Sequence, residues 1–301
     1  MKIPTITSKY IPVYSPSADI FPGPDSAFFK AGASYENWIP NDFTVVRAAD
    51  KRWHMIGITH PAPADFISHS DYNPASIHDG EWQLFHAVSA DAGNEIDTAV
   101  TAPYSFADEA KLLPPSARPG EEFNIYAPHV ISHDGKYRMF YGPAPIRTAV
   151  SDDLYNWIPA GALFLDHPSD RDPHVMPYKD GFIMTYVSEN KLFSRLSADL
   201  ANWSEPVTVF IPDSGVPESP FIVPYDNLFY LFWCIYDGTN GPYDNRTFVY
   251  VSDTPERFEK SSCLTTLDAH APEVIAAGGK GYIFSAEHPQ RGICAARIEW
   301  L

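Results

Sequence analysis

Short apolar segments separated by turn residues recur along this chain, and five of them begin in a similar way. The five similar segments are 41–46, 127–131, 172–176, 218–223 and 271–275. Successive starts at 127, 172, 219 and 271 are 45, 47 and 52 residues apart. A period of about 40 to 50 residues is typical of a propeller blade, which contains four strands.

The remainder of each unit supports the same interpretation. A second segment rich in aromatic and branched residues follows every start, at 53–57, 137–141, 182–186, 229–233 and 282–284. Turn signals such as Asp180-Gly181 precede most of them, which favours hairpins over helices. A third segment ends in a turn containing Ser and Asp at 89–91, 151–153, 197–199 and 252–253. The pattern predicts an all-β fold, a five-bladed β-propeller.

The composition favours a single propeller domain spanning 1–301, with blades starting near 42, 127, 172, 219 and 271. The 29 prolines suit loops and strand starts, and no helical stripe of convincing length is present. Because residues 42 and 127 lie 85 positions apart, the first unit is expected to carry an insertion. Long loops at the mouth of the ring are expected at 61–79 and 92–122. Residues 1–37 are expected to cap the ring or to supply a closing strand.

The charge and the cysteines exclude several classes of partner and site. A formal net charge of −17 disfavours nucleic acid and anionic membranes as partners. Three widely spaced cysteines argue against a disulfide framework and against a zinc site. No signal peptide is recognisable, so a cytoplasmic location is expected, or a secreted or periplasmic one if the chain is a processed form. The sequence leaves the oligomeric state open.

Three acidic residues, Asp42, Asp172 and Glu218, occupy what the pattern indicates is the same place in three units. Side chains at the starts of the inner strands of a propeller face a common funnel, so these carboxyl groups are expected to meet. One protonated and one ionised carboxyl group in the same site is the requirement for glycosidic bond cleavage. The alternative is that Asp42 and Asp172 cap loops, since Asp before Pro often begins a turn. Three acids at repeat positions favour the catalytic interpretation.

These motifs resemble those of the five-bladed propeller glycosidases, the clan that includes glycoside hydrolase families 43, 32 and 68. The similar residues are Asn41-Asp42, Arg171-Asp172-Pro173 and Glu218-Ser219-Pro220. Family 43, commonly a lone propeller, is the most similar branch. The fructosidase branch differs because its first acid is followed by Pro-Asn-Gly, and it usually carries a β-sandwich after the propeller.

The resemblance implies roles for individual residues. Asp42 would be the nucleophile or general base, Asp172 would stabilise the transition state or tune a pKa, and Glu218 would be the general acid. Arg171 would bind sugar hydroxyls. The resemblance implies no required cofactor, but it allows a structural calcium ion on the propeller axis, with His270 as a weak candidate for holding it.

Further candidates for sugar binding come from their positions in the repeats. They are Trp38, His86, His129, Tyr141, His174, Trp233 and His270, all near a strand start or a strand end. Aromatic rings stack on sugar faces and imidazoles donate to hydroxyl groups, although core packing is the alternative for each. Tyr236 is a further aromatic candidate for stacking on a sugar face, and the loop 237–246 is expected to form one wall of the pocket.

The expected function is hydrolysis that releases a terminal sugar, a furanoside or pentoside by resemblance, from an oligosaccharide or polysaccharide. Long loops in the first unit favour a closed pocket and therefore exo-action. Three alternatives stay open on the same fold: a carbohydrate-binding propeller without catalysis, a phosphorylase and a polysaccharide lyase. The sequence decides neither the sugar nor between retention and inversion, which depends on the distance between the carboxyl groups.

Overall fold

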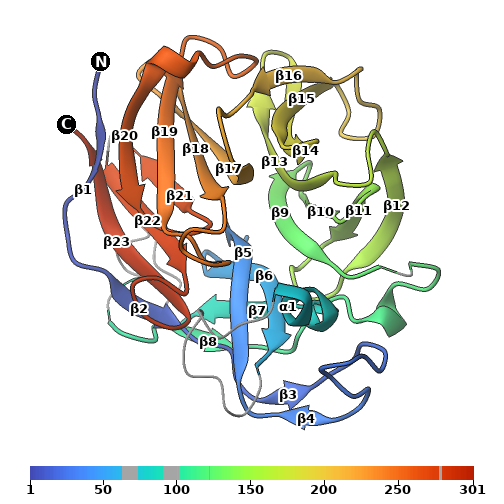
Figure 1. Ribbon diagram of the computed structural model, residues 1–301. Helices are drawn as coiled ribbons and strands as arrows, with labels where there is room; N and C mark the ends of the chain where they lie inside the picture. Colours follow the sequence, from blue (N-terminus) through green and yellow to red (C-terminus); the bar gives the residue numbers. More distant parts are fainter. Residues whose placement is uncertain (63–73, 91–99, 101, 122, 278–279) are drawn as a thin grey trace.

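The structure is a computed structural model that describes residues 1–62, 74–90, 100, 102–121, 123–277 and 280–301 (Figure 1). Five antiparallel sheets stand around a common axis, and the innermost strand of each contacts the innermost strands of its two neighbours. These contacts close into a ring that runs β5, β9, β13, β17, β21 and back to β5. The predicted five-bladed β-propeller is confirmed.

Each blade is numbered outward from the axis, so its strands are consecutive in the chain. The bounds are β5 (Trp38–Arg47), β6 (Trp53–Pro61), β7 (Gln83–Ser89) and β8 (Phe106–Asp108) in the first blade; β9 (Tyr126–His133), β10 (Lys136–Gly142), β11 (Ile146–Ser151) and β12 (Ile158–Phe164) in the second; β13 (Arg171–Tyr178), β14 (Gly181–Ser188), β15 (Lys191–Ser197) and β16 (Val207–Phe210) in the third; β17 (Val216–Tyr225), β18 (Leu228–Tyr236), β19 (Arg246–Ser252) and β20 (Cys263–Asp268) in the fourth; and β21 (Glu273–Ala277), β22 (Lys280–Ala286) and β23 (Ile293–Trp300) in the fifth.

The N-terminal segment completes the fifth blade. Strands β1 (Pro4–Ile6) and β2 (Ile11–Tyr14) both pair antiparallel with β23, the last strand of the chain. The two termini therefore lie side by side, with backbone hydrogen bonds joining Ile3 to Leu301 (Figure 1). Pairing the first strands with the last one closes the ring, because the blade gains an outer strand and the ends of the chain are held together.

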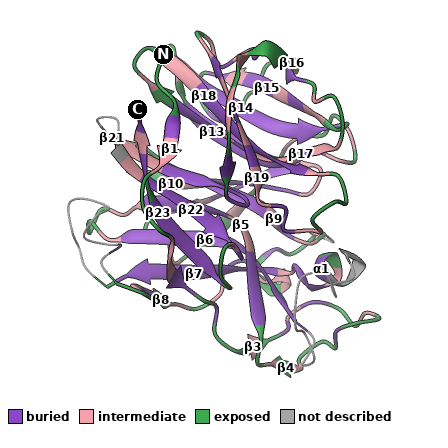
Figure 2. Cartoon of the chain, turned by 60° about the vertical axis from the view of Figure 1, so that its left-hand side comes forward, coloured by how far each residue is buried: buried purple, intermediate pink, exposed green. Residues whose placement is uncertain are grey.

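The hydrophobic core lies between neighbouring blades, whose strands are largely buried (Figure 2). Between the first and fifth blades, for example, Met55 and Phe85 pack with Phe284 and Ala295. This arrangement explains why the second strands read as continuous apolar runs rather than alternating ones. Burial of both faces fixes each sheet at a set angle around the axis.

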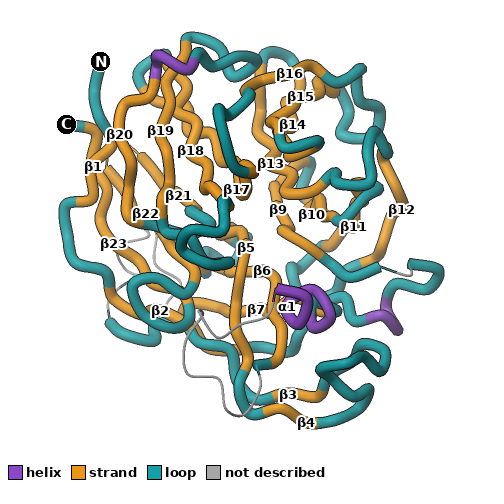
Figure 3. Tube along the Cα trace, in the orientation of Figure 1, coloured by secondary structure: helices purple, strands orange, loops and turns teal. Residues whose placement is uncertain are grey.

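Helical structure is limited to short pieces among the described residues (Figure 3). One helix, α1 (Pro74–Gly80), lies within the predicted loop 61–79 and contacts β6. The 3₁₀ turns are η2 (Pro115–Ala117) and η3 (Lys260–Ser262), and a small hairpin joins β3 (Asp19–Ile20) to β4 (Ser34–Tyr35). Within the described part of the chain, no helix is long and apolar enough to cross a membrane.

The predicted first-blade loops are partly wrong. The segment 92–122 contains β8, the outer strand of the first blade, and η2. The remainder of these two predicted loops falls in part on 63–73, 91–99, 101 and 122, which lie outside the described residues. The outer strand was missed because it has only three residues, Phe106–Asp108, and shows no periodic pattern.

The Ser-x-Asp turns that follow the third strands of the second and third blades form the same side-chain hydrogen bonds. Ser151 Oγ accepts from the N–H of Leu154 at 2.9 Å, and Asp153 Oδ1 accepts from the N–H of Asn156 at 2.7 Å. The turn beginning at Ser197 repeats both bonds, at 2.9 Å and 2.8 Å. These side chains replace backbone partners in a tight turn, so the repeated sequence signal has a physical cause.

Candidate functional site

Four of the five inner strands, β5, β9, β13 and β17, carry an interruption of two residues near the N-terminal end. The ladder between an inner strand and its neighbour breaks between residues 40 and 43, 126 and 129, 171 and 174, and 218 and 221. Asp172 (φ 53°) and Ser219 (φ 49°) adopt left-handed backbone conformations there. Interruptions of this kind re-aim side chains, and strained non-glycine residues cluster at functional sites.

This register corrects the predicted equivalence of the three acids. Asp42 is the second residue of its interruption, Asp172 is the first, and Glu218 immediately precedes its own. The residue in the third blade that corresponds to Glu218 is Arg171. The acids therefore occupy three successive places in the repeat rather than one, and they reach the axis from three different blades.

Hydrogen bonds and ion pairs join the three acids into one cluster. Ser219 donates from its hydroxyl to Asp42 Oδ1 and from its N–H to Asp172 Oδ2, the latter at 3.1 Å. Arg171 places Nε 3.5 Å from Asp172 Oδ2 and Nη2 3.5 Å from Glu218 Oε1. One serine and one arginine thus hold carboxyl groups that are 46 to 176 positions apart in the chain (218 − 172 and 218 − 42).

The cluster lines a pocket with a cavity volume of about 150 Å³ that opens to solvent. All three acids and Arg171 line it. The remaining lining residues are Asn41, Ile58, Ile77, His78, Glu81, Tyr126, Tyr236 and Pro242. Of the loop 237–246, Pro242 lines the pocket, and the stacking candidate Tyr236 lines it too. Ile58, Ile77 and Pro242 add apolar surface beside the polar groups, a combination that is typical of a small-molecule site.

The electrostatic environment separates the carboxyl groups. Burial raises the pKa of Glu218 to about 8, with Asp172 and Asp42 adding to the effect and Arg171 opposing it. Burial also raises the pKa of Asp172 to about 6, again against Arg171. For Asp42, burial raises the pKa, while the Ser219 hydroxyl and Arg171 lower it. A protonated Glu218 beside Asp172, whose pKa is lower, is the kind of arrangement that acid–base catalysis requires.

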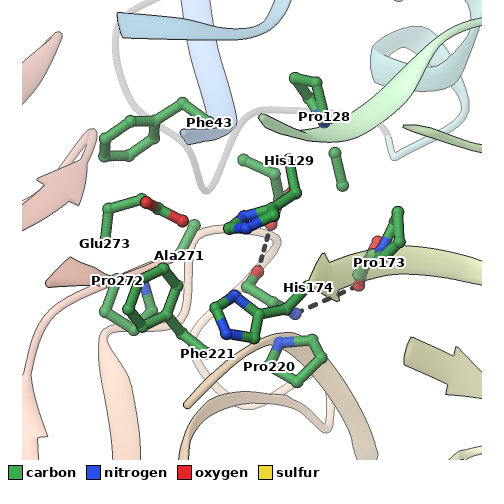
Figure 4. A pocket seen from close by; sticks show the side chains of 14 residues that line it. Phe43, Pro128, His129, Pro173, His174, Pro220, Phe221, Ala271, Pro272 and Glu273 are labelled. Atoms are coloured by element: carbon green, nitrogen blue, oxygen red, sulfur yellow. Dashed lines mark hydrogen bonds between the residues drawn. The ribbon is translucent and has the colours of Figure 1, made fainter. Parts of the chain in front are cut away.

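A second cavity lies on the axis next to the pocket, and Asp42 and Asp172 line both. His129, His174, Phe221 and Glu273 face it from four blades (Figure 4). The two predicted sugar-binding histidines therefore lie in the axial cavity, not in the pocket. His129 Nε2 donates to the carbonyl oxygen of Val175 at 2.9 Å, and burial lowers the pKa values of both histidines.

Four other predicted sugar-binding residues lie in the core and do not line the pocket: Trp38, His86, Tyr141 and Trp233. Each is at most 3% exposed. Trp38 packs against Phe21 and Phe29, and Trp233 lies in the core between the third and fourth blades. Successive residues of a strand point to opposite faces of the sheet, and in a propeller both faces are covered, so a position close to a strand start or end does not by itself turn a side chain toward the pocket.

His270 lies one layer behind the pocket. Its Nε2 is 2.9 Å from Asn41 Oδ1, and its Nδ1 is 2.9 Å from the carbonyl oxygen of Asp244. Because Asn41 lines the pocket, His270 supports the wall without facing the site. Of the residues predicted to bind sugar, Arg171 and Tyr236 thus line the pocket.

The described side chains do not fit a calcium ion held by the protein alone. Calcium takes six to eight oxygen ligands in proteins. Within the described ranges, no group of three or more His, Cys, Asp or Glu side chains is arranged to hold a metal ion. On the axis, His129 and His174 offer nitrogen, and burial raises the pKa of Glu273 well above its usual value, which favours the protonated carboxyl group.

His78, Glu81 and Tyr126 are among the pocket residues that the sequence did not predict. His78 and Glu81 belong to the first-unit insertion, which has no counterpart in the other units. Tyr126 could have been found, since it directly precedes Ala127-Pro128 and matches the repeat position of Arg171 and Glu218.

No protein-family model matches the sequence, and no curated protein matches it. Solved structures do match. A thermostable family-43 glycoside hydrolase superimposes with a TM-score of 0.63 at 14% identity, covering 88% of this chain and 90% of that one. An exo-1,5-α-L-arabinanase from a bovine ruminal metagenomic library gives a TM-score of 0.59 at 15% identity, with 86% and 92% covered.

A GH32 β-fructofuranosidase from Bombyx mori gives a TM-score of 0.54 at 15% identity, and the match covers 85% of this chain but 58% of that one. Fold similarity at such low identity concerns the architecture. The chain therefore has the five-bladed β-propeller fold that is also found in family-43 and family-32 glycoside hydrolases.

Proposed function

We propose that this protein is a glycoside hydrolase that removes a terminal sugar, a furanoside or a pentoside, from an oligosaccharide or polysaccharide. The observation that carries the proposal is the cluster of Asp42, Asp172 and Glu218 around Arg171 in one pocket. The fold shared with glycoside hydrolases of families 43 and 32 supports it.

Glu218 is the proposed general acid. With a pKa raised to about 8, its carboxyl group is mostly protonated at neutral pH. Its side chain is 27% exposed toward the pocket, so a substrate oxygen can approach it. A buried group without solvent access could not deliver its proton to a leaving oxygen.

Asp42 is the proposed base or nucleophile, and Asp172 the proposed stabiliser of positive charge on the sugar. The Ser219 hydroxyl donates to Asp42, which favours the ionised form that a base or nucleophile needs. Asp172 lies between Arg171 and the N–H of Ser219, two groups that fix its position. Its negative charge also raises the pKa of Glu218 and so keeps the acid protonated.

The walls of the pocket support action on a chain end. Ile77 and His78 from α1 form one side, and Tyr236 and Pro242 from the fourth blade form another. A pocket closed on two sides accepts a terminal sugar more readily than the middle of a polymer.

A phosphorylase would need a basic subsite for phosphate. Arg171, the arginine that lines the pocket, already faces two carboxyl groups. Phosphate would therefore approach a region rich in acidic side chains, which disfavours its binding.

A screen of aryl furanosides and aryl pentosides, with and without phosphate, tests the proposal. We expect release of the aryl group without phosphate, and its loss in Glu218→Gln when the leaving group is poor. Glu259→Gln, at a carboxylate that is 62% exposed and paired with Arg257, is the matched control and should keep full activity. Release that requires phosphate, an unsaturated product, or binding without turnover would each replace hydrolysis with another of the functions considered above.

A further inference from the structure

The insertion in the first blade carries a histidine into the mouth of the pocket. His78 is the fifth residue of α1, and it lines the pocket together with Glu81, which follows the helix. The side chain of His78 is 63% exposed, whereas that of Glu81 is 3% exposed. One member of the pair is thus accessible to a ligand, and the other is fixed beneath it.

Glu81 orients the imidazole. Its Oε2 atom lies 3.1 Å from His78 Nδ1, so the carboxylate holds the proton on Nδ1. No described residue is hydrogen-bonded to Nε2 of His78, and this nitrogen remains for a ligand. The bond to Glu81 also raises the pKa of His78, which favours an imidazole that donates from both nitrogens.

Neighbouring residues hold this arrangement from two further sides. The side-chain amide of Asn124 donates to the carbonyl oxygen of His78, which ties the end of α1 to the chain before β9. The ring of Tyr126 lies 5.5 Å from the His78 ring, centroid to centroid. The imidazole is therefore positioned before any ligand arrives, and binding loses little side-chain entropy.

His78 and Glu218 line the same pocket. The charge of Glu218 raises the pKa of His78, and His78 lowers the pKa of Glu218, which agrees with their shared pocket. Glu81 raises the pKa of Asp42, and Asp172 raises the pKa of Glu81. A general acid faces the oxygen of the leaving group, so a residue of this pocket that Glu218 influences is a candidate for contact with the leaving group.

We propose that His78, held in place by Glu81, binds a hydroxyl group of the leaving sugar and so selects what is attached to the sugar that is released. The inference rests on the proposed function, because it takes Glu218 as the general acid. Its ligand class is a neutral sugar unit on the leaving-group side of the bond. Hydrogen bonding from a positioned imidazole to a hydroxyl supplies the discrimination.

The test compares two substrates that share the released sugar. One is its 4-nitrophenyl glycoside, which offers His78 no hydroxyl group, and the other is its disaccharide. In His78→Ala we expect kcat/KM for the disaccharide to fall about ten- to hundredfold, the usual effect of losing a hydrogen bond to a charged donor. For the aryl glycoside we expect a change of less than about twofold.

Two further variants separate positioning from folding. His78→Gln keeps an amide near the place of Nε2 and should restore part of the disaccharide activity. Glu81→Gln should lower the disaccharide-to-aryl ratio in the same direction as His78→Ala, and the double variant should lose little more, since both changes remove one interaction. His133→Ala, at an exposed histidine at the far end of β9, is the matched control and should leave the ratio unchanged.

The outcomes distinguish this inference from the proposed function. If the wild-type protein cleaves neither substrate, the proposed function fails. If it cleaves both and His78→Ala lowers both equally, or lowers neither, hydrolysis stands and the role of His78 is wrong.

Discussion

The guanidinium Nη2 of Arg171 lies 3.5 Å from Oε1 of Glu218, yet the pKa of Glu218 is raised to about 8. A cation at this distance lowers a carboxyl pKa, so burial and the two neighbouring acids outweigh it here. Arg171 also lies 3.5 Å from Asp172 and lowers the pKa of that carboxyl group as well. The same side chain thus holds the cluster together while Glu218 keeps its proton.

The pH dependence of turnover should report this balance. Activity requires protonated Glu218, so kcat/KM should fall as the pH rises through about 8. In Asp172→Asn the loss of a negative charge removes one influence that raises the pKa of Glu218. The alkaline limb of the profile should therefore move to lower pH, as measured on an aryl glycoside. A limb that stays in place or moves upward would contradict the assignment of Glu218 as the acid.

Replacing Glu218 by Gln should have an effect that depends on the leaving group. General acid catalysis contributes typically about 10²- to 10⁴-fold, and a good leaving group needs little protonation. We expect a large loss of kcat on a sugar leaving group and a much smaller one on a 2,4-dinitrophenyl leaving group, measured under the same conditions. Equal losses on the two substrates would show that Glu218 has another role.

The fold could be predicted from the sequence because every blade repeats the same physical requirements. Each inner strand begins with a similar motif, and the turns at Ser151 and Ser197 form the same side-chain hydrogen bonds. Because a propeller repeats these strand and turn signals in several blades, a misleading signal in one blade does not change the predicted fold. The three acids could be predicted because they lie at the starts of inner strands, although they occupy three successive places there rather than one.

The pocket wall could not be predicted so well, because it depends on direction rather than on repeat position. Trp233 and Tyr236 are three residues apart in β18, yet one lies in the core and the other lines the pocket. Glu218 stands one repeat position before Asp172. This offset is visible only in the pairing register of the interrupted strands. His78 and Glu81 lie in an insertion, where no repeat exists to guide the assignment.

Asp42 and Asp172 should respond differently to substitution. If Asp42 acts as base or nucleophile, Asp42→Ala should abolish turnover and leave substrate binding largely intact, since the group acts mainly in the transition state. Asp172→Asn should weaken binding as well as turnover, because Asp172 is held where it can face the sugar. Calorimetry with a substrate analogue that the enzyme does not hydrolyse measures binding to both variants and to the wild type.

Azide provides the decisive comparison for these two aspartates. A small external nucleophile can enter the space that Asp42→Ala leaves, so activity should return in that variant and not in Asp172→Asn. Rescue of Asp172→Asn alone would mean that the two roles are exchanged. Wild-type turnover in Asp42→Ala would remove this residue from the mechanism.

A buried pair of histidines in the first blade should make stability depend on pH. His54 Nδ1 and His86 Nε2 are 2.8 Å apart, and both side chains are almost fully buried. Burial lowers the pKa of His54 to about 4 and that of His86 to about 3, below the usual 6.5. The folded state thus holds both rings neutral, while the unfolded chain takes up protons below pH 6.5.

The sign follows from this difference in proton uptake. The free energy of unfolding should not depend on this pair above about pH 6.5. As the pH falls from 6.5 toward 4, the pair should lower the free energy of unfolding by about 1–3 kcal/mol per histidine. Because His129 and His174 also have lowered pKa values, the measurement compares wild type with His86→Gln in urea titrations between pH 7 and pH 4. The variant should lose stability less steeply on acidification. Parallel curves for the two proteins would show that the pair does not titrate on unfolding.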